Sequence, residues 1–138
     1  MGRETLFLEQ LGAGVVMKLA VNALIHGINQ TLSEAMTLAE ASGIDSARAF
    51  DVMEASAACA PMLRYRRPLY LDEAAHDVTF SVVLARKDME VTARLAQSLG
   101  VAMPQGRVTL NRLQAAERQG YGPRDMAAML DFIRKDRE

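Results

Sequence analysis

A long run of helix-forming residues extends from about residue 11 to residue 41, where Ser42-Gly43 gives the first stop signal. At 1.5 Å per residue, about 31 helical residues form a rod roughly 46 Å long. A compact domain of 138 residues has a radius of gyration near 14 Å and hence a diameter of roughly 37 Å. The predicted helix is therefore longer than the body of the domain that contains it.

The N-terminal half of this predicted helix is apolar on most of its sides. Its apolar residues are Leu11, Val15, Val16, Met17, Leu19, Ala20, Val21, Ala23, Leu24 and Ile25. A helix that is hydrophobic nearly all round is normally buried, and this chain is too small to bury all of it. We therefore expect a missing domain or a second subunit to cover this end, so that the chain is part of a larger protein.

The remainder of the chain also favours helix. Aromatic residues make up only 5%, Trp is absent, and no stretch alternates apolar and polar residues over the length of a strand. We predict an all-α bundle around the long first helix. Glycine, proline and capping signals predict further helices after Asp45, whose carboxylate can cap Ala47 or Arg48, and over residues 80–99, 104–120 and 125–134. Residues 57–79 are expected to be irregular because Pro61 and Pro68 interrupt them.

Charge and cysteine usage exclude several classes of function. Sixteen Lys and Arg against seventeen Asp and Glu give a net charge of −1, which supplies no long-range attraction for nucleic acid or an anionic membrane. The single cysteine, Cys59, excludes a disulfide framework and a CxxC zinc site. No 18-residue apolar run and no signal peptide is found. We expect one cytoplasmic domain without a metal, nucleic-acid or membrane partner.

Five polar residues of the first helix lie along one stripe: Lys18, Asn22, His26, Asn29 and Ser33. At 100° per residue the five fall within about 80° of one another. A solvated strip is the simplest interpretation, but such strips are usually rich in Glu, Lys and Arg, and this one has a single charge in four turns. A lone ammonium among amides suits a site that stabilises negative charge developing on a substrate oxygen. Spacing alone leaves both interpretations of Lys18 open.

Two other short patterns permit more than one interpretation. Gly12-Ala13-Gly14 precedes Lys18 by one turn, and indicates either close approach of another backbone or ligand, or a frayed helix end. Without a preceding strand it is not a dinucleotide fingerprint. Phe80, Leu84 and Lys87 are spaced to share a helix face, where spacing alone favours Lys87 as a snorkelling lysine at the core boundary.

Four ordered segments nevertheless resemble one known family. They are Gly-x-Gly-x-x-x-Lys-x-x-x-Asn over residues 12–22, Glu34-Ala35 followed by Ala41-Ser42-Gly43-Ile44-Asp45, Phe-x-x-x-Leu-x-x-Lys-Asp over residues 80–88, and Gly-x-Gly-x-x-Asp over residues 120–125. Together they resemble the C-terminal helical domain of the β-hydroxyacid dehydrogenases, which include 3-hydroxyisobutyrate dehydrogenases and the tartronate-semialdehyde and glyoxylate/succinic-semialdehyde reductases. The resemblance implies an all-α fold like the C-terminal domain of 6-phosphogluconate dehydrogenase.

The resemblance also implies roles for particular residues. Lys18 matches the catalytic lysine, which acts as general acid on the substrate oxygen while a nicotinamide delivers hydride to carbon. Asn22 and Gly14 match substrate-binding positions. Cofactor-binding positions are matched by Phe80, Lys87 and Asp88, and the cofactor is NAD or NADP.

The resemblance implies one C-terminal substrate and oligomerisation domain over residues 1–138, in a homodimer or larger oligomer, with its Rossmann domain absent from this chain. Such a chain is expected to be inactive alone. A stand-alone helical interaction or dimerisation module, or a Schiff-base enzyme that uses Lys18, remain as alternatives. We expect no functional role for the remaining candidates. His26 should be a core or boundary histidine, and Cys59 should be buried as a small apolar residue. The side chains of His76, Arg64, Arg66 and Arg67 should be solvated.

Overall fold

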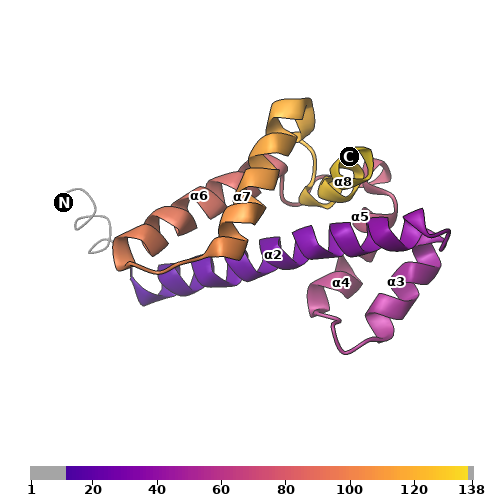
Figure 1. Ribbon diagram of the computed structural model, residues 1–138, viewed down its shortest axis with the longest axis horizontal. Helices are drawn as coiled ribbons and strands as arrows, with labels where there is room; N and C mark the ends of the chain where they lie inside the picture. Colours follow the sequence, from indigo (N-terminus) through magenta and orange to yellow (C-terminus); the bar gives the residue numbers. More distant parts are fainter. Residues whose placement is uncertain (1–11, 137–138) are drawn as a thin grey trace.

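The computed structural model describes residues 12–136, which form an all-α bundle around one long helix (Figure 1). The elements in chain order are α2 (Ala13–Ala41), α3 (Ser46–Ala55), α4 (Pro61–Tyr65), α5 (Arg67–Leu71), the 3₁₀ turn η1 (Glu73–Ala75), α6 (Val82–Leu99), α7 (Pro104–Ala116), the π-helical turn η2 (Glu117–Tyr121), the 3₁₀ turn η3 (Met126–Ala128) and α8 (Met129–Lys135). Within the described residues the only β-type pairing is one isolated bridge, between Ser81 and Asp125. The predicted fold class is confirmed.

The ends of the helices follow the signals in the sequence. After α2 the chain turns at Gly43, whose φ of 96° favours glycine. Asp45 then caps α3, because its carboxylate accepts hydrogen bonds from the backbone N–H groups of Ala47 and Arg48 at 3.2 and 3.3 Å. The predicted end of the first helix and the predicted cap of the second are both observed.

Three predicted details are wrong. Residues 57–79 are not irregular throughout, since they contain α4, α5 and η1. The predicted helix over residues 104–120 is regular only to Ala116 and continues as the π-helical turn η2. Phe80 does not share a helix face with Leu84 and Lys87, because α6 begins at Val82 after the capping residue Ser81.

The axis of the molecule is α2, which contacts α3, α6, α7 and α8. Figure 1 shows α6 and α7 above its N-terminal half, with α3, α4, α5 and α8 gathered around its C-terminal half. One buried cluster, which includes Met36, Phe50 and Leu130, packs around the C-terminal half of α2. A second cluster, which includes Val82 and Phe132, fills the space between α6, α7 and α8.

The N-terminal half of α2 is covered on only part of its surface. Leu19 is buried, whereas Val15, Met17, Val21 and Leu24 keep 46%, 59%, 47% and 64% of their surface exposed. Leu11, which was also predicted to lie in this helix, lies outside the described residues. No helix within residues 12–136 has both the length and the hydrophobicity needed to cross a membrane.

Candidate functional site

The polar stripe of α2 runs from solvent into the core. Lys18 is exposed and Asn22 is half-buried, whereas His26, Asn29 and Ser33 are 3%, 2% and 0% exposed. The stripe is therefore not a solvated strip. Its inner residues are covered by other helices, and its outer end, at Lys18 and Asn22, is where a second molecule could reach it.

The inner residues of the stripe are used by the fold itself. The Asn29 amide donates to the carbonyl oxygen of Met126 at 3.0 Å and accepts from the Tyr70 hydroxyl at 2.6 Å. The Ser33 hydroxyl donates to the backbone oxygen of Asn29 at 2.8 Å. Burial raises the pKa of Tyr70 to about 12, so its phenol stays protonated and can donate. Asn29 and Ser33 thus hold α2 to its neighbours and are not accessible to a substrate.

At the outer end, Asp88 of α6 joins two members of the stripe. Its Oδ2 atom accepts a hydrogen bond from Nδ2 of Asn22 at 2.9 Å and lies 3.4 Å from Nε2 of His26. The ring of His26 also packs against Phe80, with 5.6 Å between the ring centroids. Residues that are far apart in sequence, Asn22 and Asp88, are therefore brought together as one polar contact between α2 and α6.

Two lysines flank this contact. Lys18 lies one helical turn before Asn22, and Lys87 directly precedes Asp88. Both are exposed, and neither forms a hydrogen bond or an ion pair with another of residues 12–136. The pKa of Glu117 lies below its ordinary value mainly because of its hydrogen bonds with Arg86, with a smaller effect from the charge of Lys87. Each exposed ammonium has the charge to bind an anion.

Gly14 lies in the exposed first turn of α2. Apart from its chain neighbours and the backbone of its own helix, no described atom lies within 4 Å of the position that a Cβ on this glycine would occupy. Packing within the described chain therefore does not require glycine here, and both close approach by another molecule and a frayed helix end remain as explanations.

The backbone around Phe80 is anchored by Asp125, which is 1% exposed. Its carboxylate accepts from the backbone N–H groups of Thr79 and Phe80 at 2.9 and 3.2 Å and forms an ion pair with Arg66. Desolvation acts to raise the pKa of Asp125, but hydrogen bonds from Ala127 and Thr79 and the charge of Arg66 hold it below its ordinary value. Asp125 thereby fixes the backbone of the segment that carries Phe80 and leads into α6.

The arginines of the 64–67 segment differ from the sequence interpretation. Arg64 is exposed as expected, but Arg66 is only 7% exposed because it is paired with Asp125. Arg67 is held by Glu54 and Asp51, at 2.8 and 2.7 Å. No feature of the sequence separates Arg66 from its neighbours, because its partner lies 59 residues away.

The remaining residues fit the sequence interpretation more closely. His76 is exposed, Cys59 is partly buried and His26 is a core histidine. What the sequence interpretation missed is the contact of His26 with Asp88. The position of His26 on the stripe, one turn beyond Asn22, was the sequence feature that could have indicated this contact.

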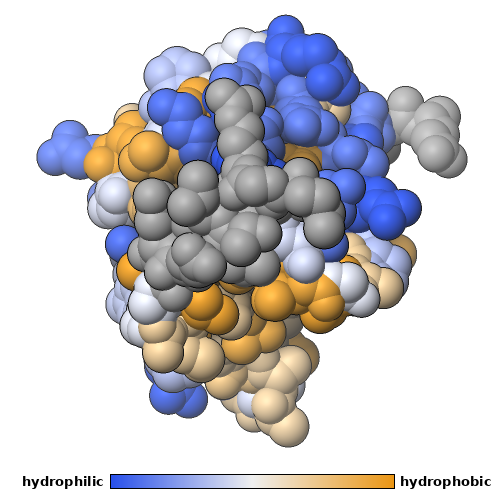
Figure 2. Space-filling view, turned by 90° about the vertical axis from the view of Figure 1, so that its left-hand side faces the viewer, coloured by the Kyte–Doolittle hydropathy of each residue, from blue (hydrophilic) through white to orange (hydrophobic). Residues whose placement is uncertain are grey.

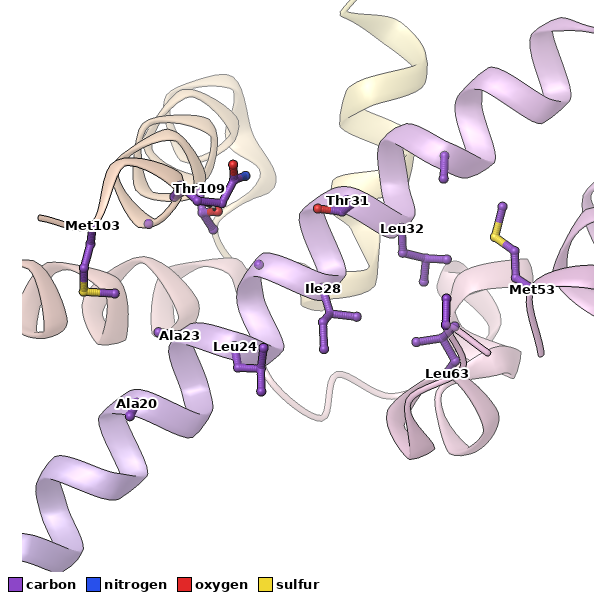
Figure 3. Close-up of a pocket in the computed structure, with 15 residues that line it drawn as sticks. Ala20, Ala23, Leu24, Ile28, Thr31, Leu32, Met53, Leu63, Met103 and Thr109 are labelled. Atoms are coloured by element: carbon purple, nitrogen blue, oxygen red, sulfur yellow. Dashed lines mark hydrogen bonds between the residues drawn. The ribbon is translucent and has the colours of Figure 1, made fainter. Parts of the chain in front are cut away.

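The face of α2 away from the stripe has a different character. An apolar groove of about 660 Å³ lies along it, between α2, α7 and the α3–α4 region. In Figure 3, Leu24, Ile28 and Leu32 of α2 point to the same side of the helix, towards Leu63. Figure 2, which views the end where α2 begins, shows hydrophobic surface gathered in its lower part and hydrophilic surface at the upper right. None of the described residues that line the groove is titratable.

Comparison with known proteins agrees with the resemblance seen in the sequence. Residues 12–133 match the family model described as "NAD-binding of NADP-dependent 3-hydroxyisobutyrate dehydrogenase". The chain is 27% identical to glyoxylate/succinic semialdehyde reductase 1 of Arabidopsis thaliana over 138 residues, and 28% identical to 3-sulfolactaldehyde reductase of Escherichia coli K12 over 134 residues. These alignments cover 100% and 97% of this chain but only 47% and 45% of the relatives.

Solved structures give the same result. The 3-hydroxyisobutyrate dehydrogenase of Salmonella typhimurium matches 88% of this chain with a TM-score of 0.78 and 27% identity, over 42% of its own length. A Mycobacterium tuberculosis 3-hydroxyisobutyrate dehydrogenase, at 20% identity and the same TM-score, shares the fold. Because the family match covers nearly all of the described residues, this chain belongs to the family of the NAD-binding domain of NADP-dependent 3-hydroxyisobutyrate dehydrogenase.

Proposed function

We propose that this chain is the C-terminal substrate and oligomerisation domain of an NAD(P)-dependent dehydrogenase that acts on a small 3-hydroxy acid or semialdehyde. One observation supports this most strongly. The outer end of the α2 stripe combines an exposed lysine without an ion-pair partner among the described residues, Lys18, with an amide, Asn22, that is held in place by Asp88. A cation beside an oriented amide suits a substrate with a carbonyl or hydroxyl oxygen and a carboxylate.

In this proposal Lys18 is the acid and base of the reaction. During reduction its ammonium donates a proton to the carbonyl oxygen, and during oxidation the neutral amine takes the proton back from the hydroxyl. The ammonium stabilises an alkoxide more than a neutral carbonyl, which lowers the barrier. Asn22 holds the hydroxyl form of the substrate while Lys18 is an ammonium, since its Nδ2 atom is engaged by Asp88 and its Oδ1 atom is left to accept from that hydroxyl. The hydroxyl proton must turn from Oδ1 of Asn22 to the neutral amine before Lys18 removes it.

Residues beside this site fit a nicotinamide cofactor, NAD or NADP. Phe80 offers a half-buried aromatic side chain next to the stripe, and the exposed ammonium of Lys87 can meet an anionic or hydroxylated part of a dinucleotide. Asp88, which directly follows Lys87 in α6, is hydrogen-bonded to Asn22. When bound, the reduced cofactor supplies the hydride. Most of the contacts with it would come from a Rossmann domain covering the Lys18 side of α2.

In this proposal, a different partner covers each side of α2. The outer end of the polar stripe faces the cofactor domain, and we propose that the opposite apolar groove is covered by a second copy of the chain, in a cytoplasmic homodimer or larger oligomer. The groove also favours the second candidate function, a stand-alone helical interaction module. The module needs neither Lys18 nor Asn22, so their substitution separates the two proposals.

A chimaeric enzyme tests the proposed activity. Joining residues 12–138 to the N-terminal half of the Arabidopsis reductase should give oxidation of NADPH or NADH in the presence of glyoxylate or succinic semialdehyde. Lys18→Ala should lower kcat by about a hundredfold or more, because a general acid contributes at least that much. Lys135→Ala provides the matched control, since this lysine is exposed and lies in the last helix. Equal loss in both variants, or full activity in Lys18→Ala, would contradict the proposal.

A further inference from the structure

His26 is a buried ring with one polar partner. It is 3% exposed, its Nε2 atom lies 3.4 Å from Oδ2 of Asp88, and its Nδ1 atom has no hydrogen-bond partner among the described residues. Three groups face it: the carboxylate of Asp88 and the ring of Phe80 from the α6 side, and the more distant charge of Arg66. Burial lowers the pKa of His26, against the opposing effect of Asp88, so the ring is neutral at pH 7.

This environment selects one tautomer. A neutral imidazole has one N–H and one bare nitrogen. With the proton on Nε2, the ring donates to Asp88 and leaves only a bare Nδ1 without a partner. With the proton on Nδ1, a buried N–H is left unpaired and the lone pair of Nε2 faces a carboxylate oxygen, which is the more unfavourable arrangement. His26 is therefore a donor to Asp88.

His26 affects Asn22 indirectly, through Asp88. Asp88 uses the same oxygen for both side chains, so the N–H of His26 fixes the position of the carboxylate that Asn22 contacts. A carboxylate accepts hydrogen bonds and does not donate them. Asn22 must therefore turn Nδ2 towards Asp88, which leaves Oδ1 available on the side chain that lies one turn from Lys18.

We propose that His26 is a positioning residue, whose Nε2–H holds Asp88 against Asn22 so that Asn22 presents its carbonyl oxygen to a substrate hydroxyl beside Lys18. The part that concerns the substrate rests on the proposed function. The link from His26 through Asp88 to Asn22 does not, and it can be tested on the chain itself without any substrate or cofactor.

The first test is the tautomer. Nitrogen-15 NMR of the 138-residue chain should show the ring of His26 protonated on Nε2 and unprotonated on Nδ1 at pH 7. The ring of His76, which is exposed, serves as an internal reference in the same spectrum. A His26 ring protonated on Nδ1 would overturn the proposal, because it could not donate to Asp88.

The second test uses a matched pair of variants. His26→Phe keeps a ring against Phe80 but removes the donor, whereas His26→Gln places an amide N–H near the position of Nε2. Hydrogen exchange of the Asn22 side-chain amide should be about tenfold faster in His26→Phe, because a bond that supports a charged acceptor is lost. Exchange in His26→Gln should stay near the wild-type rate. Equal rates in wild type and His26→Phe would overturn the proposal.

A pH titration gives a readout that packing alone would not change. In the wild type, the Asn22 amide signals should shift as His26 takes up a proton below its ordinary pKa of 6.5. This step should be absent in His26→Gln and present in His76→Gln. If the step persists in His26→Gln, another group causes it and the link is wrong. An inactive chimaera would contradict the proposed function, but it would leave these signals unchanged.

Discussion

Asn22 and Asn29 show how the same residue type serves different purposes on one helix face. Asn29 is buried and both ends of its amide are bonded within the protein, to Met126 and Tyr70. Asn22 is half-buried and has a partner only for Nδ2 among the described residues. An amide with an unused hydrogen-bonding atom at the surface can bind a ligand, whereas a buried amide with both ends bonded cannot. At the scale of single residues, the candidate site therefore consists of Lys18 and Asn22, with Asp88 and His26 behind them.

Replacing Asn29 should destabilise the fold without touching this site. Asn29→Ala leaves the buried Tyr70 hydroxyl and the Met126 carbonyl without their partner, which should lower the free energy of unfolding by about 2 kcal/mol. Urea unfolding measures the change. Asn111→Ala, at an exposed position of α7, should have almost no effect. Equal midpoints for the two variants would show that the Asn29 contacts contribute nothing.

His26 should make the free energy of unfolding depend on pH below 6.5. Its pKa in the folded chain lies below the ordinary 6.5, so between these two values the unfolded chain binds a proton that the folded chain excludes. The stabilisation is complete above pH 6.5 and is lost as the pH falls through the folded pKa. Urea midpoints should therefore decline as the pH is lowered below the ordinary pKa of 6.5.

The matched control for this dependence is His26→Gln, in which the decline should be much smaller. Asp125 and Asp131 also have lowered pKa values, but carboxylates act at more acidic pH. An equal decline in His26→Gln and wild type would mean that other groups are responsible for the dependence.

At the scale of elements, the start of α6 depends on a partner far along the chain. Ser81 caps the helix by accepting a hydrogen bond from the N–H of Leu84 at 3.2 Å. Asp125 accepts hydrogen bonds from the backbone N–H groups of Thr79 and Phe80, the two residues before Ser81. The turn before η3 therefore sets where α6 begins and where Phe80 points. A local cap and a distant carboxylate act on the same few residues.

Asp125→Asn should disturb both functions of this carboxylate. It leaves Arg66 buried without its counter-charge, and loss of one partner of a buried pair typically lowers the free energy of unfolding by about 3 kcal/mol or more. Thermal unfolding followed by circular dichroism measures the loss. Asp72→Asn, at an exposed position, is the control and should unfold with the wild type. Similar unfolding temperatures in all three proteins would contradict this account.

The long helices could be predicted from sequence because their signals are local. Gly43, Asp45 and Gly100 mark ends that depend only on nearby residues. The helices α4 and α5 have five residues each, too few to show a period or to be stable alone. They exist because the core holds Leu63 and Tyr70 in place, and a pattern search cannot detect that contact.

The candidate site shows the same limit. Spacing placed Lys18, Asn22 and His26 on one stripe, and the family resemblance added Phe80, Lys87 and Asp88. Neither could say where the stripe enters the core, because that depends on how α6 crosses α2. The contact of His26 with Asp88 and the pairing of Arg66 with Asp125 both join residues about 60 positions apart, with separations of 62 and 59.

At the scale of the whole molecule, α2 is a helix with two unlike sides. One side carries the polar stripe, and the other lines the apolar groove. Val15, Met17, Val21 and Leu24 remain largely exposed along its N-terminal half, as expected for a helix too long for its own domain. Exposed apolar surface of this kind is typical of interaction sites, so the helix has room for a cofactor domain on one side and a second subunit on the other.

The proposed second subunit can be tested at Leu24, which lines the groove and is 64% exposed. A charge there would be buried without a partner when two chains associate, but it would remain solvated in the single chain. We expect the wild type to form a dimer or larger oligomer in analytical ultracentrifugation, and Leu24→Glu to weaken this association by at least about tenfold.

Leu38→Glu is the matched control, because Leu38 lies on the same helix at 75% exposure but does not line the groove. It should associate as the wild type does, and both variants should keep the helical circular-dichroism spectrum. A wild type that stays monomeric at high concentration would contradict the second subunit. Equal weakening by the two substitutions would place the contact away from the groove, since a contact through the groove must distinguish Leu24 from Leu38.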